Sequence, residues 1–446
     1  MDKLAKKAKE AARPLSFLAG KVKAAALHAM AERLLEQEVE VLEANRKDMD
    51  QVGKALEGET SRERVREAVD RVTLTPEDLK KIAEIIHTIA DLPDPVGEVT
   101  GMWTRPNGMQ VSRVRTPIGV IAVISDFGPK VSVEALVLCV KSGNACVLRA
   151  SPDWNHSNQI IFALLREAAE QAGVPVGAIS LVERTEREAA LELLRLPKLI
   201  DAIIPRGGAG LRKVVTEQAR MPVLCHDGGV GYVYADAEAD LPMAQNIVVN
   251  SKAQETTASN SVDTVLVHLR ISRTFLPGLV RRLLDEYKVD VYGCTKTIAL
   301  TGDEEFPAYK ATRLAEETHW GQQYLSPTIA IKVVDDMDAA LDHINRYGPV
   351  HTASIVTRDY AAAMRFTEEV DAGTVAVNIS TRLHDGHEYG LGGQMGVSIA
   401  RVHARGPLAL DELTCQKYVV LGNGQLRHPH PVFVAYEDAL ILKPHP

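Results

Sequence analysis

The chain has 446 residues, of which 46% are apolar and 25% charged, and its formal net charge is -8. This length exceeds what one ordinary core accommodates, so we expect a globular protein of two or three domains. The acidic balance, spread along the chain, argues against a nucleic-acid-binding surface, and the sequence contains no uninterrupted run of 18 apolar residues for a membrane helix.

Two sequence features bear on the cellular location, namely the first twenty residues and the cysteines. MDKLAKKAKEAARPLSFLAG carries charges throughout, so we expect no signal peptide. The odd number of cysteines and the lack of CxxC spacing fit a reducing compartment and give no metal-ligand pattern. We therefore expect a cytoplasmic protein without a metal site. The cysteines are Cys139, Cys146, Cys225, Cys294 and Cys415.

The first hundred residues are expected to form solvated helices that cover the next domain. Apolar residues recur at helical spacing between charged ones, which predicts a long helix over residues 21–52 and a second over 79–89. Residues 100–115 differ, because the turn Arg105 to Gly108 (RPNG) is flanked by residues of strand type. This pattern predicts a β-hairpin, either an oligomerisation arm or a simple structural ribbon.

From Pro117 the sequence alternates apolar strands with amphipathic helices joined by short connections. Continuous apolar strands between helices predict a parallel sheet covered on both faces, so we expect an α/β fold with a doubly wound domain whose ligand lies beyond the carboxyl ends of the strands. The expected strands are 117–125, 144–151, 178–183, 199–205 and 230–235, and the expected helices are 132–142, 156–172, 186–196, 209–219 and 241–254.

A second α/β set follows residue 259. After it, the tail from Arg427 is rich in proline and histidine, which favours an irregular, solvated extension over a metal-binding segment. The expected strands of the second set are 263–269, 295–302, 327–335, 351–359 and 374–380, and its expected helices are 273–287, 337–347 and 360–370.

Two features near the ends of the first set of strands suggest a nucleotide. Gly207, Gly208 and Gly210 follow an expected strand and open a helix, so their backbone N–H groups can face a phosphate or a nicotinamide, although a tight packing turn explains them equally well. Arg149 ends an expected strand at the edge where a ribose or a 2′-phosphate would lie.

Taken together, these stretches resemble the aldehyde dehydrogenase superfamily, and within it the glutamate-5-semialdehyde dehydrogenase (γ-glutamyl phosphate reductase) family. The resemblance extends to about Leu426. It rests on LPDPVGEVT, RPNGMQV, PIGVIAVI, KSGNACVLR, IPRGGAGL, NSKAQ with SNSVDT, INRYG followed by His351, VDAGTVAVN, TRLHDG with YGLGG, and HARGPLALDEL.

The resemblance implies an oxidoreductase that reduces a small acyl phosphate with NADPH in proline biosynthesis, by way of a cysteine thioester. It also implies an aldehyde-dehydrogenase-like fold and a homodimer or homotetramer that binds neither nucleic acid nor membrane. The domains expected from it are a dinucleotide-binding domain over residues 1–257 with the 100–115 arm, a catalytic-type domain over 258–405, an oligomerisation strand within 406–426 and an extension over 427–446.

Several chemical positions depart from the family pattern. The family's RPSxCN loop is ETTASN here, residues 255–260, so Ser259 takes the place of the nucleophile, with Asn260 beside it. The family's YEARPNVT is SDFGPKVS, residues 125–132. Lys130 adds a positive charge there, where an anionic substrate group would bind, although a solvated lysine is the simpler account. Gln323 stands at the position of a glutamate that is thought to hold the nicotinamide ribose.

Other positions change as well. Gln394 replaces a further family glutamate, and Gly231 with Tyr232 replaces a Cys-His pair. By the same resemblance Arg382 and His351 are candidates for substrate binding, and Arg149 with Gly207, Gly208, Gly210 and Gln323 for cofactor binding.

A serine hydroxyl is a weak nucleophile unless a base takes its proton, whereas a cysteine is partly thiolate at neutral pH. His226 is the nearest upstream candidate base for Ser259. We therefore expect impaired or altered reductase activity. The alternative is a non-catalytic paralogue that keeps the fold and uses the site for binding, sensing or scaffolding.

Overall fold

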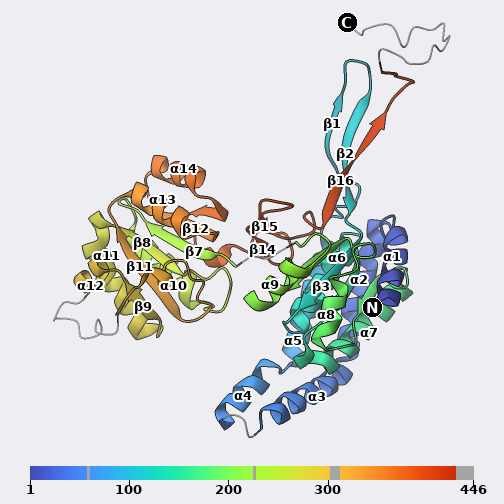
Figure 1. The fold of residues 1–446 in the computed structure, drawn as a ribbon, viewed down its shortest axis with the longest axis horizontal. Helices are drawn as coiled ribbons and strands as arrows, with labels where there is room; N and C mark the ends of the chain where they lie inside the picture. Colours follow the sequence, from blue (N-terminus) through green and yellow to red (C-terminus); the bar gives the residue numbers. More distant parts are fainter. Residues whose placement is uncertain (58–60, 225–227, 302–311, 428–446) are drawn as a thin grey trace. The chain divides into compact units, whose positions relative to one another are not determined.

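The computed structural model describes the chain except for residues 58–60, 225–227, 302–311 and 428–446. Its contacts divide the described chain into two compact units (Figure 1). Unit 1 comprises Met1–Gly207, Val214–Val223 and the chain from Ala409, and unit 2 comprises Gly208–Lys213 and Leu224–Leu408. Residues 228–257, which we assigned to the first domain, therefore belong to unit 2, and the expected extension after residue 427 lies outside the described residues.

The core of unit 1 is a four-stranded parallel sheet in the order β5-β4-β3-β6, as the continuous apolar runs predict. Every residue of β3 and β4 is buried. The strands are β3 (Val120–Ser125), β4 (Ala145–Arg149), β5 (Ile179–Leu181) and β6 (Ala202–Arg206), and the helices between them are α6 (Pro129–Lys141), η1 (Pro152–Trp154), α7 (Asn155–Gln171) and α8 (Arg187–Leu193), with α9 (Ala209–Gln218) after β6.

Most of the N-terminal helices pack against α6 and α7, as expected for helical cover, whereas the first packs on β3, β4 and β5 and the fourth packs on the third. The helix expected over residues 21–52 is two helices, because Gln37 leaves the helical conformation with φ -105° and ψ 25° and serves as the C-cap of one and the N-cap of the next. The five helices are α1 (Asp2–Leu15), α2 (Gly20–Glu36), α3 (Glu38–Leu56), α4 (Arg62–Arg71) and α5 (Pro76–Asp91).

The expected hairpin is confirmed. Strands β1 (Val99–Thr104) and β2 (Gln110–Pro117) pair antiparallel, and β16 (Thr414–Leu421) adds to β2 as a third antiparallel strand. At the turn, Gly108 has a φ of +84°, a left-handed conformation that favours glycine, and its N–H donates to the carbonyl of Arg105. Chain segments about 300 residues apart thus form one ribbon in unit 1 (Figure 1).

Unit 2 is built on a parallel sheet in the order β10-β9-β11-β8-β7-β12-β13. Its side chains alternate between two apolar layers. Val233 and Ala235 of β7 join the layer that includes α10 and α11, whereas Tyr232 and Tyr234 join the layer that includes α13 and α14. Both faces of the sheet are therefore covered by helices.

The strands of this sheet are β7 (Val230–Ala235), β8 (Thr264–His268), β9 (Asp290–Gly293), β10 (Arg313–Leu314), β11 (Thr328–Val334), β12 (Val350–Val356) and β13 (Ala372–Val377). The other elements of unit 2 are α10 (Leu241–Ala253), α11 (Leu269–Arg281), η2 (Arg282–Glu286), α12 (Thr295–Thr301), η4 (Glu317–His319), α13 (Met337–Arg346), α14 (Tyr360–Glu369), η5 (Thr381–Leu383), and the two-strand ribbon of β14 (Val397–Ser398) and β15 (Gly406–Pro407).

Two strand predictions are wrong. Residues 230–235 form a strand, but β7 pairs with β8 and β12 of unit 2 and not with the sheet of unit 1. The strand expected over 295–302 is helix α12, and β9 takes the place beside β11 instead. In α12 the hydroxyl of Thr301 donates to the carbonyl of Thr297, a bond between successive turns that the β-branched composition did not reveal.

Candidate functional site

The predicted nucleophile lies in the turn that joins α10 to β8. Ser259 is half-buried there, and the neighbouring Asn260 is 5% exposed. Two residues of the altered loop bond to each other, because Glu255 Oε1 accepts from both the N–H and the hydroxyl of Thr257. These bonds, led by the one from the hydroxyl, lower the pKa of Glu255. The sequence that replaces the family's loop therefore forms a defined polar turn.

Both ends of the Asn260 amide are occupied. Its Nδ2 donates to the carbonyls of Arg382 and His384, at 3.4 and 3.0 Å, and its Oδ1 accepts a hydrogen bond from the Arg382 Nη1. An amide held in this way positions the turn that carries Ser259, and both of its Nδ2 hydrogens are used by protein carbonyls.

Arg382 joins the turn to a distant loop. Its Nε donates to Gln254 Oε1 at 2.7 Å while its Nη1 bonds Asn260. Burial lowers the pKa of the guanidinium, against the opposing effect of the Asp385 and Glu255 carboxylates. The structure thus brings Arg382 together with Asn260 and shows two of the Arg382 nitrogen atoms bonded within the protein.

Gln323 also lies at this turn. Its Nε2 donates to the carbonyl of Ser259 at 3.2 Å. A Cβ atom on Gly228 would lie 2.9 Å from the Gln323 Oε1 and 2.8 Å from Nη2 of Arg212. The absence of a side chain at Gly228 therefore leaves room for these two groups, of which Gln323 bonds the Ser259 turn.

His351 lies in the interior. It is fully buried on β12, and its Nδ1 shares a 2.8 Å hydrogen bond with the hydroxyl of Thr352. The same hydroxyl bonds His384 Nδ1, and His384 Nε2 bonds the Thr374 hydroxyl at 2.6 Å. Burial lowers the pKa of His384 to about 4, so its imidazole is neutral at pH 7. This buried network is next to Asn260, which bonds the His384 carbonyl.

A buried charge pair near the turn was missed by the sequence reasoning. Lys252 is fully buried, and its Nζ has no hydrogen-bond partner among the described residues. Burial lowers its pKa to about 8 and raises that of Asp263 to about 6, each opposed by the other's charge. Asp263 accepts from the N–H groups of Gly231 and Tyr324. The available signal was a lysine near the end of the largely apolar helix α10, in NSKAQ, and an aspartate directly before the apolar strand β8, in SVDT.

The remaining predicted residues belong to unit 1 or to the glycine-rich turn. Arg149 is 7% exposed at the carboxyl end of β4, where its Nη2 donates to the carbonyl of Thr185 at 2.9 Å and its Nη1 lies 3.8 Å from Asp126 Oδ1. Burial lowers the pKa of Arg149 and raises that of Asp126. Its Nε has no hydrogen-bond partner among the described residues. Lys130 is exposed in the first turn of α6.

The glycine-rich turn links β6 to α9. Gly207 ends the first segment of unit 1, and Gly208 begins the short segment Gly208–Lys213 that belongs to unit 2. A Cβ atom on Gly208 or Gly210 would meet no atom within 4 Å. Their backbones therefore face open space. A packing turn would have neighbouring atoms there, whereas a ligand that approaches the start of α9 needs that space free.

Three further points concern the site predictions. His226 falls outside the described residues. Among the described residues, no group of three or more histidine, cysteine, aspartate or glutamate side chains is arranged to hold a metal ion. The helices of the described chain include none with the length and apolarity to cross a membrane.

Comparisons with known proteins agree along nearly the whole chain. A model of the Aldehyde dehydrogenase family matches residues 1–291 and 314–419. The chain is 45% identical over 423 residues, 94% of its length and 97% of the relative's, to a protein of Moorella thermoacetica named gamma-glutamyl phosphate reductase. It is 44% identical, over 95% of its length and 98% of the relative's, to the protein of that name from Caldanaerobacter subterraneus subsp. tengcongensis.

A solved structure agrees as well. The crystal structure of gamma-glutamyl phosphate reductase from Thermotoga maritima superimposes with a TM-score of 0.87 at 38% identity, covering 96% of this chain and 99% of that one. An acetylating aldehyde dehydrogenase from Geobacillus thermoglucosidasius, 19% identical with a TM-score of 0.64, shares the fold over 96% of this chain and 97% of its own. The expected aldehyde-dehydrogenase-like α/β fold is therefore confirmed.

Proposed function

This chain belongs to the aldehyde dehydrogenase family, and from that premise we propose that it is an oxidoreductase that reduces an acyl phosphate of the γ-glutamyl phosphate type to the aldehyde. The hydride donor is a nicotinamide dinucleotide. The observation that carries this proposal is the 45% identity to a reductase of that name over 94% of the chain. The substrate is then a small molecule, and the pathway is proline biosynthesis.

The role of Ser259 follows from its place in the turn. In the proposed reaction the Ser259 Oγ would attack the acyl carbon, its proton would pass to solvent and phosphate would leave, which gives an ester. A nicotinamide dinucleotide would supply the hydride that reduces this ester to the aldehyde, and the hydroxyl would be regenerated. Among the described residues no imidazole bonds the Ser259 hydroxyl, so no described base takes its proton. An ester also accepts hydride less readily than a thioester, and we infer turnover orders of magnitude below that of a cysteine enzyme.

The decisive experiment restores a cysteine. We expect Ser259→Cys to raise phosphate-dependent oxidation of glutamate-5-semialdehyde, read as NADPH formation, at least tenfold, because a thiolate is present without a base. Ser259→Ala is the matched control, since it removes the hydroxyl and keeps the turn. A wild-type rate above that of Ser259→Ala would support the role of the hydroxyl, equal rates would contradict it, and a fast Ser259→Cys would mean that the rest of the site is competent.

A second candidate function has its own support. The Asn260 amide is bonded at both ends and Arg382 is bonded to Gln254 and Asn260, so the described turn is held by contacts within the protein. Such a site suits a non-catalytic paralogue that binds a ligand and does not turn it over. Silence of Ser259→Cys in the presence of measurable dinucleotide binding would favour this role.

We propose that the protein prefers NADPH to NADH and that Arg149 sets this preference. Its guanidinium lies at the carboxyl end of β4 beside a carboxylate whose pKa burial raises, and its Nε has no partner among the described residues. A 2′-phosphate would supply that partner and a compensating charge. We expect Arg149→Met to weaken NADPH binding about tenfold or more and NADH binding by less, as measured by fluorescence titration. Equal weakening of both cofactors would refute this assignment.

The β1-β2-β16 ribbon is proposed as the oligomerisation arm. It exposes large apolar side chains, with Met102 67%, Tyr418 64% and Leu421 62% exposed, which is characteristic of a surface that another chain covers. Light scattering should report a homodimer or homotetramer, and Tyr418→Asp should shift it toward the monomer.

The four cysteines within the described residues are free, which supports a cytoplasmic setting.

A further inference from the structure

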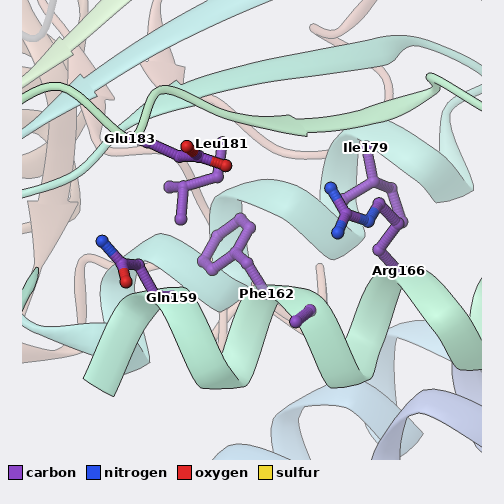
Figure 2. A pocket seen from close by; sticks show the side chains of 7 residues that line it. Gln159, Phe162, Arg166, Ile179, Leu181 and Glu183 are labelled. Atoms are coloured by element: carbon purple, nitrogen blue, oxygen red, sulfur yellow. The ribbon is translucent and has the colours of Figure 1, made fainter. Parts of the chain in front are cut away.

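A cavity of about 260 Å³ opens in unit 1 between helix α7 and the edge strand β5 (Figure 2). None of its residues belongs to the site described above. This volume is below the range of roughly 300–1,000 Å³ of drug-sized sites, so it suits a molecule as small as an amino acid. It is lined by Gln159, Phe162, Ala163, Arg166, Ile179, Leu181 and Glu183.

The cavity has an apolar floor. Phe162 and Ile179 are each 3% exposed, and Leu181 is half-buried beside them. Ile179 and Leu181 are two residues apart on β5 and so face the same side of the strand, toward α7. The ring of Phe162 rises from α7 into the middle of this space (Figure 2). The floor therefore offers aliphatic and aromatic contacts to a small apolar group.

The rim carries two opposite charges that the described protein leaves unpaired. Arg166 and Glu183 are exposed, and neither forms a hydrogen bond or an ion pair with another described residue. Their immediate neighbours behave differently, because Glu167 is paired with Arg33 and Arg184 with Glu192. Opposite charges placed at one cavity without being paired to each other leave both available to a ligand.

The positions of Arg166, Glu183 and Gln159 around the cavity indicate the kind of ligand. Arg166 lies two helical turns after Gln159 on α7, roughly 10 Å along the axis. Figure 2 shows Arg166 on the Ile179 side, Glu183 and Gln159 on the other side, and Phe162 between them. A small zwitterion in this cavity therefore has a cation on one side of Phe162 for its carboxylate and acceptors on the other side for its ammonium group.

We propose that this cavity binds a free α-amino acid with an apolar side chain. Arg166 holds its carboxylate, which a guanidinium matches with two parallel N–H donors. Glu183 and the amide oxygen of Gln159 receive its ammonium group, since the Gln159 Nε2 is already used on Asn155 Oδ1. Its side chain lies on Phe162. The proposal does not depend on the reaction assigned to Ser259, so the two can fail separately.

The test is calorimetric titration of the full-length protein with L-leucine. We expect a dissociation constant on the order of 1 mM, as befits so small a ligand. Isoamylamine lacks the carboxylate and 4-methylpentanoate lacks the ammonium, so each should bind at least tenfold more weakly. Arg166→Gln and Glu183→Gln should each weaken L-leucine at least tenfold, whereas Arg195→Gln, at another exposed site of unit 1, should leave it unchanged.

Three results would overturn the proposal. The first is no heat of binding up to about 50 mM L-leucine with folded protein, well above the millimolar affinity expected. The second is binding that neither charge variant weakens. The third is equal affinity for the amine or the acid alone, which would mean that the cavity recognises one charge and not a zwitterion. Both variants replace exposed side chains, so their folding can be checked by circular dichroism before titration.

Discussion

The hydrogen bond from Gln323 to the Ser259 carbonyl allows a test of how the Ser259 turn is held in place. In the described structure the Gln323 Nε2 donates to that carbonyl at 3.2 Å. Gln323→Glu keeps the size of the side chain and removes its only donor, because an ionised carboxylate only accepts hydrogen bonds. The Ser259 carbonyl would then face a negative oxygen in place of an N–H group.

The expected loss can be worked from these contacts. Removing one partner and leaving a half-buried carbonyl unsatisfied destabilises by about 1–3 kcal/mol. The new carboxylate can attract Arg212, since both groups lie within 3 Å of the space above Gly228. A partly exposed ion pair contributes only about 0–1 kcal/mol, so the loss outweighs the gain. For a unit of this size the midpoint of thermal unfolding should fall by roughly 2–10 °C.

The assay is thermal unfolding at pH 8 and pH 4.5, with Gln322→Glu as the matched control. Gln322 is exposed and directly adjacent, so the control introduces the same charge without the lost bond. At pH 4.5 a glutamate is partly protonated and regains a donor, so the deficit of Gln323→Glu relative to its control should shrink. If the two variants unfold together at both pH values, Gln323 does not hold the turn.

Three other changes have definite expected outcomes. Gly128→Ala should destabilise the fold by about 1–3 kcal/mol, because the added Cβ would lie 2.9 Å from the Trp154 ring. Gly208→Ala is the control, since open space surrounds that position, and its free energy of unfolding should stay within about 0.5 kcal/mol of wild type when both are measured by urea unfolding. The folded pKa of His384, about 4, is below its unfolded value of about 6.5, so its contribution of about 3 kcal/mol is present above pH 6.5 and is lost as pH falls toward 4. His384→Gln should flatten that slope in unfolding free energy, and an unchanged slope would contradict the assignment. Arg382→Lys cannot reproduce both side-chain bonds and should destabilise by about 1–3 kcal/mol in the same assay, unless those bonds are absent in solution.

Much of the fold is readable in the chain itself. The apolar runs that became β3 and β4 are continuous because both faces of a parallel strand are buried, and this requirement is local to each strand. The RPNG turn likewise specifies its hairpin from four adjacent residues. The expectation that Ser259 occupies the nucleophile position also comes from the chain alone, because it rests on matching the loop sequence to the family.

The partners of these segments depend on tertiary structure. The run at 230–235 is recognisable as a strand, but its neighbours in the sheet lie about 30 and 120 residues away in the chain, and nothing in the six residues selects them. Helix α12 shows the same limit, because a seven-residue run rich in threonine suits a strand or a helix until β9 pairs with β11 in the sheet.

The candidate site shows this division most clearly. The sequence by itself determined only the residue types, namely Ser259, Asn260, Gln323 and Arg382. Only the tertiary structure decided that Gln323 bonds the Ser259 carbonyl from 64 residues away and that Arg382 bonds Asn260 from 122 residues away. Hydrogen bonds act over about 3 Å in space whatever the separation along the chain, so these contacts exist only once the folded backbone has brought the groups together.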